Sequence, residues 1–320
     1  MKVCIVGAGA IGGFIGTRLA AAGGVQVSAL ARGATLDALR IHGWRLREGD
    51  ALLTAPLAQA SDSAADLGVQ DLVVIAVKGP ALGAIAAAIG PLIGERTVVL
   101  PAMNGVPWWF GGSTGPLDSV DPGGRIAAAI PYGQVLGCVV HASTSQAEPG
   151  LVQHRMGKGL IVGEPEGGES ARARVVAGLL SDAGFEVTLS PRIRYDIWYK
   201  LWGNMTINPV SAITGATADR LLDDPLVSAF CIAAMREAAA IGERIGCAIS
   251  ETPEDRQLVT RKLGAFKTSM LQDVEAGRPI ELDSIVAAAR EIGQRVGVAT
   301  PNIDALLGLT RLFAQVRGLY

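Results

Sequence analysis

The sequence has few of the residues that build disulfide frameworks or metal sites. It contains four cysteines, none of them in a CxxC pair, and three widely separated histidines. Scattered cysteines of this kind are typical of a reducing compartment, where disulfides are rare. The sequence therefore predicts a cytoplasmic protein with no metal site and four free thiols, at Cys4, Cys138, Cys231 and Cys247.

Charge and long hydrophobic runs are also scarce. Charged residues make up 18% of the chain and the formal net charge is −2, so no basic excess exists to neutralise nucleic-acid phosphates. The apolar run over residues 3–16 holds five glycines, which is unlike a signal-peptide core. Gly79–Gly94 contains two prolines and is shorter than the roughly 18 residues of a membrane span. We therefore expect a soluble protein with no nucleic-acid and no membrane partner.

Apolar residues, at 49%, and 41 glycines are what the chain has in abundance. Its 320 residues fit about two domains of roughly 100–200 residues each. Buried strands are predicted at Lys2–Val6, Val25–Leu30, Asp71–Val77 and Thr97–Ala102, with helices at 10–22 and 82–93 between them. Strands that alternate with helices predict βαβ units and a parallel, doubly wound sheet.

The second half of the chain changes character near Ser190-Pro191. Before this point we expect short strands that close the same sheet, and after it helices almost throughout. The expected strands are 136–143, 151–154, 159–162 and 186–189, with a helix at 170–183, and the later helices are 193–214, 225–246, 254–275 and 283–297. The predicted class is α/β, with an N-terminal Rossmann dinucleotide-binding domain (1–190) and an all-α C-terminal domain (191–320). The apolar C-terminal helices fit either a homodimer contact or the core of the second domain.

A glycine motif stands directly after the first predicted strand and opens the first helix. Gly7, Gly9 and Gly12 have the GxGxxG spacing, with Ala10 and Ile11 between the last two. Glycines there allow a tight turn, a close approach of backbone to a pyrophosphate, and tight helix packing. The alternative, a purely structural glycine-rich turn, is less consistent with the strand, the helix and the N-terminal position.

The residues after the second predicted strand favour NADP over NAD. NAD-specific motifs place an acidic residue there to bind the ribose hydroxyls, but residues 29–33 contain no acid. Arg32 supplies a planar cation suited to a 2′-phosphate. An ordinary solvated surface arginine is the alternative.

Three polar residues share one face of an apolar helix in the second half. Lys200, Asn204 and Asn208 are spaced i, i+4, i+8, so each step drifts only about 40° around the helix. If they face inward they need polar partners, unless they bond to one another or face solvent. Ser269 and Glu281, twelve residues apart, could border the same cleft, although each could equally be a capping residue or a surface charge.

These blocks together resemble the ketopantoate reductase (2-dehydropantoate 2-reductase) family over essentially the whole chain. The blocks that carry the resemblance are GAGAIGG, Arg32-Gly33, Val77-Lys78, Asn104-Gly105, KLWGNMTIN and SMLQDVEAGRPIELD. The last two are far more specific than the glycine motif. The resemblance implies NADPH-dependent reduction of ketopantoate to pantoate, in the biosynthesis of pantothenate and coenzyme A.

The resemblance also implies a role for each site residue. Lys200 would be the general acid, and Glu281 would orient it or the substrate hydroxyl. The residues implied to bind substrate are Asn104, Asn204, Asn208 and, for the carboxylate, Ser269. Those implied to bind the cofactor are Gly7, Gly9, Ala10, Ile11, Gly12, Arg32, Lys78, Asn104 and Glu281. A lysine suits this chemistry because its ammonium can stabilise and protonate the oxygen that gains charge when hydride arrives.

Three features depart from the family pattern, and they concern the end of the pocket that selects the substrate. Met103 stands where a polar residue is common, and Phe266 stands where some members have an asparagine. The loop 106–125 is long, and its Trp108-Trp109 fits either a cap over the cleft or packing and subunit contact. Two alternatives therefore remain: a relative that reduces another 2-oxo acid or a bulky ketone, and a non-catalytic NADP-binding sensor.

Overall fold

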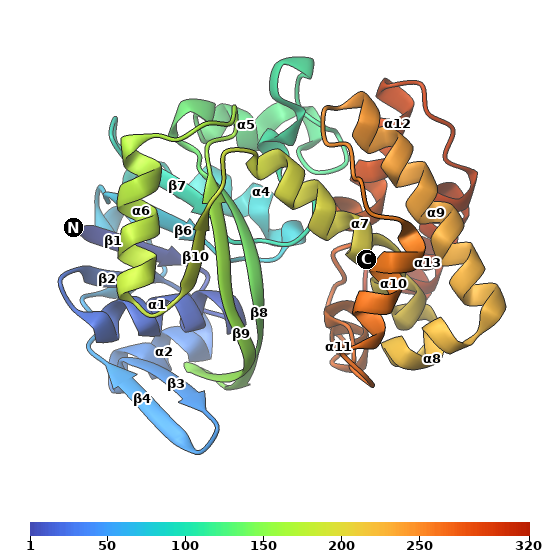
Figure 1. The fold of residues 1–320 in the computed structure, drawn as a ribbon. Helices are drawn as coiled ribbons and strands as arrows, with labels where there is room; N and C mark the ends of the chain where they lie inside the picture. The colour runs from blue at the N-terminus through green and yellow to red at the C-terminus, as the bar shows by residue number, and fades with distance from the viewer. The chain divides into compact units, whose positions relative to one another are not determined.

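The computed structural model describes residues 1–320 apart from the side chain of Ser113. The chain forms two units (Figure 1). The first comprises Met1–Met103, Gly111–Pro116 and Gly123–Arg194, and the second comprises Asn104–Phe110, Leu117–Pro122 and Tyr195–Tyr320. The second unit thus takes two short segments from the 104–122 region, which the sequence does not suggest.

The first unit is built on a parallel five-stranded sheet. Its order is β5-β2-β1-β6-β7, the order of dinucleotide-binding folds. The strands are β1 (Lys2–Val6), β2 (Gln26–Leu30), β5 (Ala60–Ser61), β6 (Leu72–Ile75) and β7 (Val98–Pro101). Strands β1, β6 and β7 are almost fully buried, which is why each reads as a continuous apolar run. The predicted parallel sheet is confirmed.

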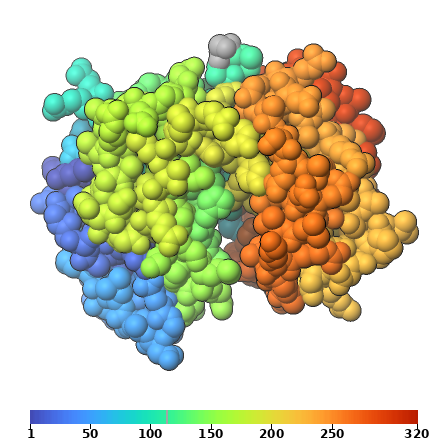
Figure 2. Space-filling model, in the orientation of Figure 1, coloured from blue at the N-terminus to red at the C-terminus, as the bar shows by residue number. Residues whose placement is uncertain are grey.

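A second five-stranded sheet lies in the same unit, with the order β10-β9-β3-β4 and with β8 paired to β9. Its strands are β3 (Trp44–Glu48), β4 (Ala51–Ala55), β8 (Gly137–Glu148), β9 (Leu151–Gly163) and β10 (Glu186–Leu189). The hairpin of β3 and β4 protrudes from the first unit, in blue in Figures 1 and 2. The prediction that the later strands close the first sheet is therefore wrong.

A bulge explains why the sequence predicts two short strands, 151–154 and 159–162, where the structure has the single strand β9. The β8–β9 pairing shifts register between His141 and Ser143. Opposite this point Gly157 has a φ of +75°, and a Cβ there would lie 2.5 Å from the carbonyl oxygen of His141. In the sequence Gly157 suggests a turn, but in the structure it is the extra residue of a β-bulge.

Helix α1 packs against strands of both sheets. The helices of the first unit are α1 (Ala10–Ala22), α2 (Gly33–His42), α3 (Ala64–Leu67), α4 (Gly79–Ala88), α5 (Arg125–Ala129) and α6 (Ala171–Asp182). A Cβ on Gly16 would lie 2.7 Å from the Trp44 ring of β3 and 3.1 Å from the Ile5 side chain of β1. Only glycine lets the helix lie this close to both strands, so α1 joins the sheets into one core.

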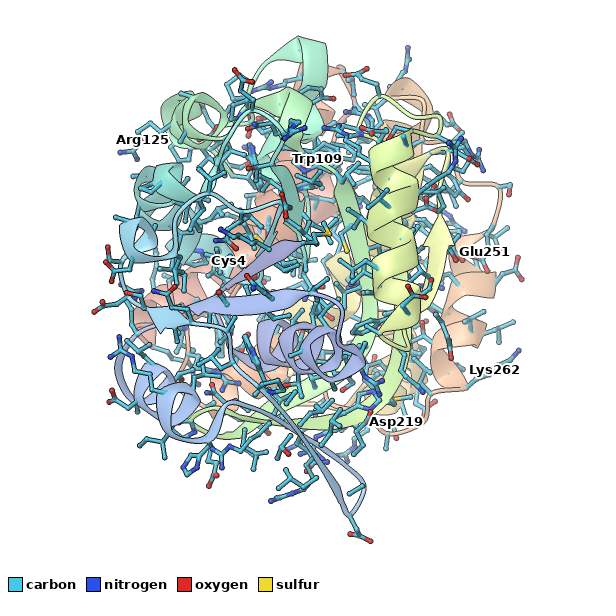
Figure 3. The ribbon with its side chains drawn as sticks, turned by 90° about the vertical axis from the view of Figure 1, so that its left-hand side faces the viewer. Cys4, Trp109, Arg125, Asp219, Glu251 and Lys262 are labelled. Carbon is cyan, nitrogen blue, oxygen red and sulfur yellow. The ribbon has the colours of Figure 1, made fainter. Side chains whose placement is uncertain are left out.

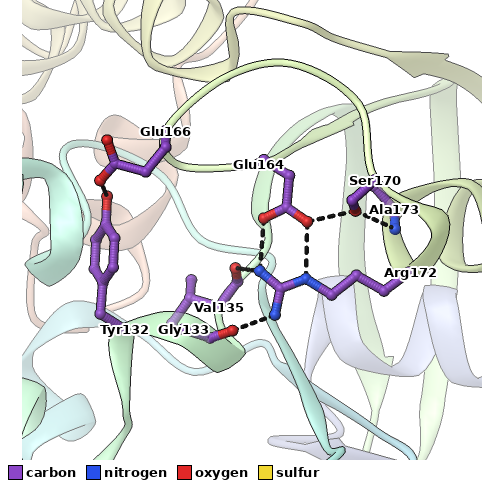
Figure 4. Close-up of polar contacts among 8 residues, drawn as sticks. All are labelled: Tyr132, Gly133, Val135, Glu164, Glu166, Ser170, Arg172 and Ala173. Carbon is purple, nitrogen blue, oxygen red and sulfur yellow. Dashed lines mark hydrogen bonds and ion pairs between the residues drawn. The ribbon is translucent and has the colours of Figure 1, made fainter.

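An ion pair fixes the start of α6 to the preceding chain (Figure 4). Arg172 donates from Nε and Nη2 to the two carboxylate oxygens of Glu164, at 2.8 and 2.6 Å. Its Nη2 also donates to the Val135 carbonyl at 3.1 Å, and its Nη1 donates to the Gly133 carbonyl. The hydrogen bond from Arg172 holds the pKa of Glu164 below its ordinary value. Both side chains are mostly buried, so the pair is more than a surface contact.

We expect Arg172→Ala to lower the free energy of unfolding by about 2 kcal/mol, between the values for exposed and buried pairs. Because the Glu164 pKa is depressed, its contribution is present above the ordinary carboxyl pKa and is lost as the pH falls through the folded value. The difference between wild type and variant, measured by urea unfolding, should therefore shrink below about pH 4. Arg174→Ala is the control, because the pair of Arg174 and Glu169 is exposed. Equal losses in the two variants would contradict the prediction.

The second unit is helical, as predicted. Its helices are α7 (Ile193–Thr214), α8 (Ala218–Asp223), α9 (Pro225–Arg244), α10 (Pro253–Arg261), α11 (Ser269–Glu275), α12 (Ala288–Arg295) and α13 (Pro301–Val316), with a π-helical turn at Asp283–Ala287. The single helix predicted over 254–275 is wrong. Gly264 has a φ of +68°, which ends helical continuity, and Thr268 caps a new helix through the N–H of Leu271.

Among the described helices, α9 is long and apolar enough to cross a membrane by length and composition. Its contacts explain the apolar character: it packs against α8, α10, α12 and α13. Two indole groups of α7 also donate to its carbonyls, Trp198 to Ala238 at 3.2 Å and Trp202 to Met235 at 2.8 Å. These contacts are those of a helix packed within a bundle.

Candidate functional site

The glycine turn between β1 and α1 has two glycines fixed by packing and one facing open space. Gly7 has a φ of +90°, and a Cβ there would lie 2.6 Å from the Val77 side chain. A Cβ on Gly12 would lie 2.0 Å from the carbonyl oxygen of Gly7. The Cβ position of Gly9, in contrast, has no described heavy atom within 4 Å. The turn is therefore tight where it meets the sheet and open where a ligand's phosphates would approach.

The start of α1 suits an anion. Gly9 is the N-cap residue, and no described side chain caps the helix or places an acid in its first turn. Ala10 and Ile11 follow it and are only half-buried. Backbone N–H groups at such an end, with the positive end of the helix dipole, bind phosphate. The residues present fit a pyrophosphate.

Two cations lie at the same edge of the sheet as the glycine turn. In the parallel register Val6 of β1 lies between Leu30 of β2 and Ile75 of β6, so the three carboxyl ends are neighbours. Arg32 follows β2 as the N-cap of α2 and is exposed. Lys78 follows β6 as the N-cap of α4 and is half-buried. The topology thus brings the two predicted cofactor cations to either side of the turn.

In the second unit, Lys200 and Asn104 are in direct contact. The Nζ of Lys200 donates to Oδ1 of Asn104 at 2.8 Å, although the two residues are far apart in the sequence. Both are half-buried. Asn204 and Asn208 lie on the same face of α7 one and two turns further on, half-buried and buried respectively. An ammonium hydrogen-bonded to one amide, on a helix face that carries two more, can bind a polar substrate and donate a proton to it.

The backbone around Asn104 is held by the segment that carries Glu281. The N–H of Val106 donates to the carbonyl of Ser284 at 2.7 Å. Gly105, between Asn104 and Val106, has a φ of +80°, and a Cβ there would lie 2.5 Å from the Ser284 carbonyl oxygen. Ser284 in turn donates from Oγ to the Glu281 carbonyl at 3.5 Å. The structure therefore brings together the three segments that carry the predicted residues Asn104, Lys200 and Glu281.

Ser269 lies on a different helix from the residues above. It is the first residue of α11 and is exposed. Its proposed role in binding a carboxylate stays a prediction.

Both parts of the chain match one known family. Residues 3–167 match the family described as ketopantoate reductase PanE/ApbA, and residues 192–314 match its C-terminal counterpart. The chain belongs to the ketopantoate reductase family. It is therefore an oxidoreductase that acts on a CH–OH group.

Similar proteins span the full length of the chain. A protein of Mesorhizobium japonicum named 2-dehydropantoate 2-reductase is 43% identical to this chain over 326 residues. The alignment covers 100% of both chains. A structure from Ralstonia solanacearum, described as a candidate ketopantoate reductase, is 57% identical with a TM-score of 0.96, covering 100% of this chain and 99% of the other. A D-mandelate dehydrogenase with NADH and anilino(oxo)acetate has a TM-score of 0.86 with full coverage of both chains. At 21% identity, that likeness shows a shared fold.

The aromatic loop of this family member is a packing element. Trp108, Trp109 and Phe110 are all at most 3% exposed. Phe110 stacks on Trp198 of α7 with ring centroids 6.1 Å apart. A run of three aromatic residues is itself a signal of burial, so packing, one of the two alternatives, explains these side chains. Phe266 likewise packs on a core cluster that includes Ile207.

Further on, the same loop is fixed by a residue that sequence reasoning missed. The carboxylate of Glu291 on α12 accepts the backbone N–H groups of Asp118 and Ser119, at 3.0 and 2.8 Å. No sequence signal links a helix carboxylate to backbone groups of a distant loop. The contact ties the second part of the loop to the second unit.

The cysteines of this reductase-family chain are structural. All four are buried and free; Cys4 lies on β1 within the sheet (Figure 3). Burial raises the pKa of the Cys4 thiol to about 12 and that of Cys231 to about 11, which suppresses the reactive thiolate. Across the described residues no group of three or more His, Cys, Asp or Glu side chains could hold a metal ion.

Proposed function

We propose that this protein reduces ketopantoate to pantoate with NADPH, as a step in the biosynthesis of pantothenate and coenzyme A. The observation that carries the proposal is the contact between the Lys200 ammonium and Asn104, in a chain that is 43% identical to a protein named 2-dehydropantoate 2-reductase. The domain of residues 1–190 would bind the cofactor, and that of residues 191–320 would bind the substrate. Four buried free thiols are consistent with a cytoplasmic enzyme.

The cofactor-binding role rests on the geometry of the first unit. Gly7, Gly9, Ala10, Ile11 and Gly12 would hold the pyrophosphate through the open turn and the helix end. The exposed Arg32 would bind the 2′-phosphate, for which a guanidinium is suited. Lys78, Asn104 and Glu281 would lie toward the nicotinamide half. NADPH supplies, when bound, the hydride that reduces the substrate carbonyl carbon.

The second unit would provide the proton and the orientation. Lys200 would donate a proton to the carbonyl oxygen as that oxygen gains negative charge, because an ammonium both stabilises and neutralises it. Asn104 directs the ammonium through their 2.8 Å hydrogen bond. Asn204 and Asn208 would bind polar groups of the substrate, Ser269 its carboxylate, and Glu281 would orient Lys200 or the substrate hydroxyl.

A related reductase that acts on another 2-oxo acid is the second candidate. It is favoured by the shared fold of D-mandelate dehydrogenase and by Met103, a half-buried apolar side chain beside Asn104. One methylene in an apolar pocket changes discrimination by about 10- to 200-fold, and one hydrogen-bonding group by more, so these differences are enough to change the preferred substrate.

The two candidates are separated by steady-state rates with NADPH and a panel of 2-oxo acids, with ketopantoate and benzoylformate included. We expect the highest kcat/KM for ketopantoate, by at least about tenfold over benzoylformate. A reversed order would favour the second candidate. NADPH binding with no turnover of any carbonyl substrate would instead indicate a sensor.

A further inference from the structure

The segment that carries Glu281 is held on both sides by Leu319 and Tyr320, which follow α13. The N–H of Ile280 donates to the carbonyl of Leu319 at 3.0 Å. The hydroxyl of Tyr320 donates to Oδ1 of Asp283 at 2.7 Å. Ile280 and Leu319 are 2% and 4% exposed, so this backbone bond is shielded from water. Glu281 lies between Ile280 and Asp283, the two residues that these hydrogen bonds hold.

The turn that begins at Asp283 transmits this constraint to Asn104. In a regular α-helix the N–H of Ala288 would bond to the carbonyl of Ser284, four residues before it. Here it bonds to the carbonyl of Asp283, five residues before it, while the Ser284 carbonyl accepts the N–H of Val106. Such π-helical turns occur often at functional sites.

We propose that Tyr320 and Asp283 form a positioning pair that acts through the 280–284 segment on Glu281 and Asn104, and through Asn104 on Lys200. The inference rests on the proposed function, in which Lys200 donates the proton. In this role the pair acts through the backbone and needs no contact with the substrate. Their effect is to fix the backbone that holds Asn104 at 2.8 Å from the Lys200 ammonium.

The charges around the pair favour this hydrogen bond at neutral pH. Burial raises the pKa of the Asp283 carboxyl, while the hydrogen bond from Tyr320 and the positive charge of Arg311 oppose that rise. Burial and the same hydrogen bond raise the pKa of Tyr320 to about 12. The hydroxyl therefore keeps its proton and remains the donor.

The first test removes the hydroxyl. Tyr320→Phe is expected to lower kcat about fivefold, because a loosened proton donor costs rate, and to leave the KM for NADPH within about twofold, because the glycine turn and Arg32 belong to the first unit and are unchanged. Asp283→Ala should have the same effect, and the double variant should lose no more than either single variant. Asp283→Asn should retain most of the rate, because its amide oxygen still accepts the hydrogen bond.

Tyr132→Phe is the matched control. Tyr132 also donates to a carboxylate, that of Glu166 at 2.6 Å (Figure 4), but in the first unit. It should cost stability as Tyr320→Phe does and leave kcat unchanged. The proposal would be overturned if Tyr320→Phe kept the wild-type kcat, or if Asp283→Asn were as impaired as Asp283→Ala.

Amide hydrogen exchange tests the pair independently of activity. Tyr320→Phe and Asp283→Ala should speed exchange at Ile280 and Val106 several-fold, whereas Tyr132→Phe should not. Unchanged exchange at both amides would overturn the proposal. A wild-type protein that turns over no 2-oxo acid would refute the proposed function instead, and faster exchange in the variants would still support the structural link.

Discussion

Lys200→Ala is expected to lower kcat by about 10³-fold while the Kd for NADPH changes by less than about twofold, since general acid catalysis typically contributes 10²- to 10⁴-fold. The substitution removes the ammonium that contacts Asn104 at 2.8 Å. In the proposed mechanism, the oxygen that receives charge from hydride transfer would then lose its proton donor. Cofactor binding is expected to persist because the glycine turn and Arg32 belong to the first unit.

Two further variants separate charge from proton donation. Lys200→Arg keeps a cation, but a guanidinium does not release its proton near neutral pH, so we expect kcat to recover only partly. Lys262→Ala removes an exposed lysine from the same unit (Figure 3) and should leave kcat unchanged. Stopped-flow measurement of NADPH oxidation in a single turnover reports on the chemical step directly. A Lys200→Ala rate within tenfold of wild type would remove this residue from the proposed mechanism.

The parts of the fold that were predictable are those with a local signal. Strands β1, β6 and β7 are buried on both faces, so each is a continuous apolar run between loop residues. The glycine motif is likewise contained within a strand, a turn and a helix start. The Lys200, Asn204 and Asn208 stripe follows directly from helical periodicity, and α7 includes all three.

The second sheet was predicted only in part: strands were expected within β8, β9 and β10, but their pairing with β3 and β4 was missed because it joins residues far apart in the sequence. In β3 the exposed Arg47 lies next to the buried Leu46, and the strand pairs in parallel with β9, about a hundred residues later. Trp44 and Leu46 alternate with arginines, which is the pattern of a half-buried strand, but nothing in so short a run indicates a partner about a hundred residues away.

The support around the site is hidden for a different reason. The bond from the Val106 N–H to the Ser284 carbonyl joins two backbone groups, and every non-proline residue has both. Residue type therefore carries no information about it. The sequence could indicate Lys200 and Asn104 as candidates, whereas the backbone bond that holds the chain beside Asn104 becomes visible only in the fold.

Arg32→Asp is expected to raise the KM for NADPH by about 10²-fold and to change that for NADH by less than about threefold, because a 2′-phosphate would meet a carboxylate in place of a guanidinium. The exposed position of Arg32, at the N-cap of α2 beside the glycine turn, allows this contact without other changes to the sheet. An aspartate there can also accept hydrogen bonds from the ribose hydroxyls of NADH. The measurement is kcat/KM with each cofactor at saturating 2-oxo acid.

Arg155→Asp makes the same change of charge on an exposed residue of β9 in the same unit. It should alter both cofactors equally, because a charge on β9 has no reason to distinguish a 2′-phosphate from a 2′-hydroxyl, and slightly, because exposed charges are screened at physiological ionic strength. If Arg32→Asp also weakens NADPH and NADH alike, Arg32 is not the 2′-phosphate contact. The preference for NADPH would then have to come from a residue outside the β2–α2 junction, since residues 29–33 contain no other cation.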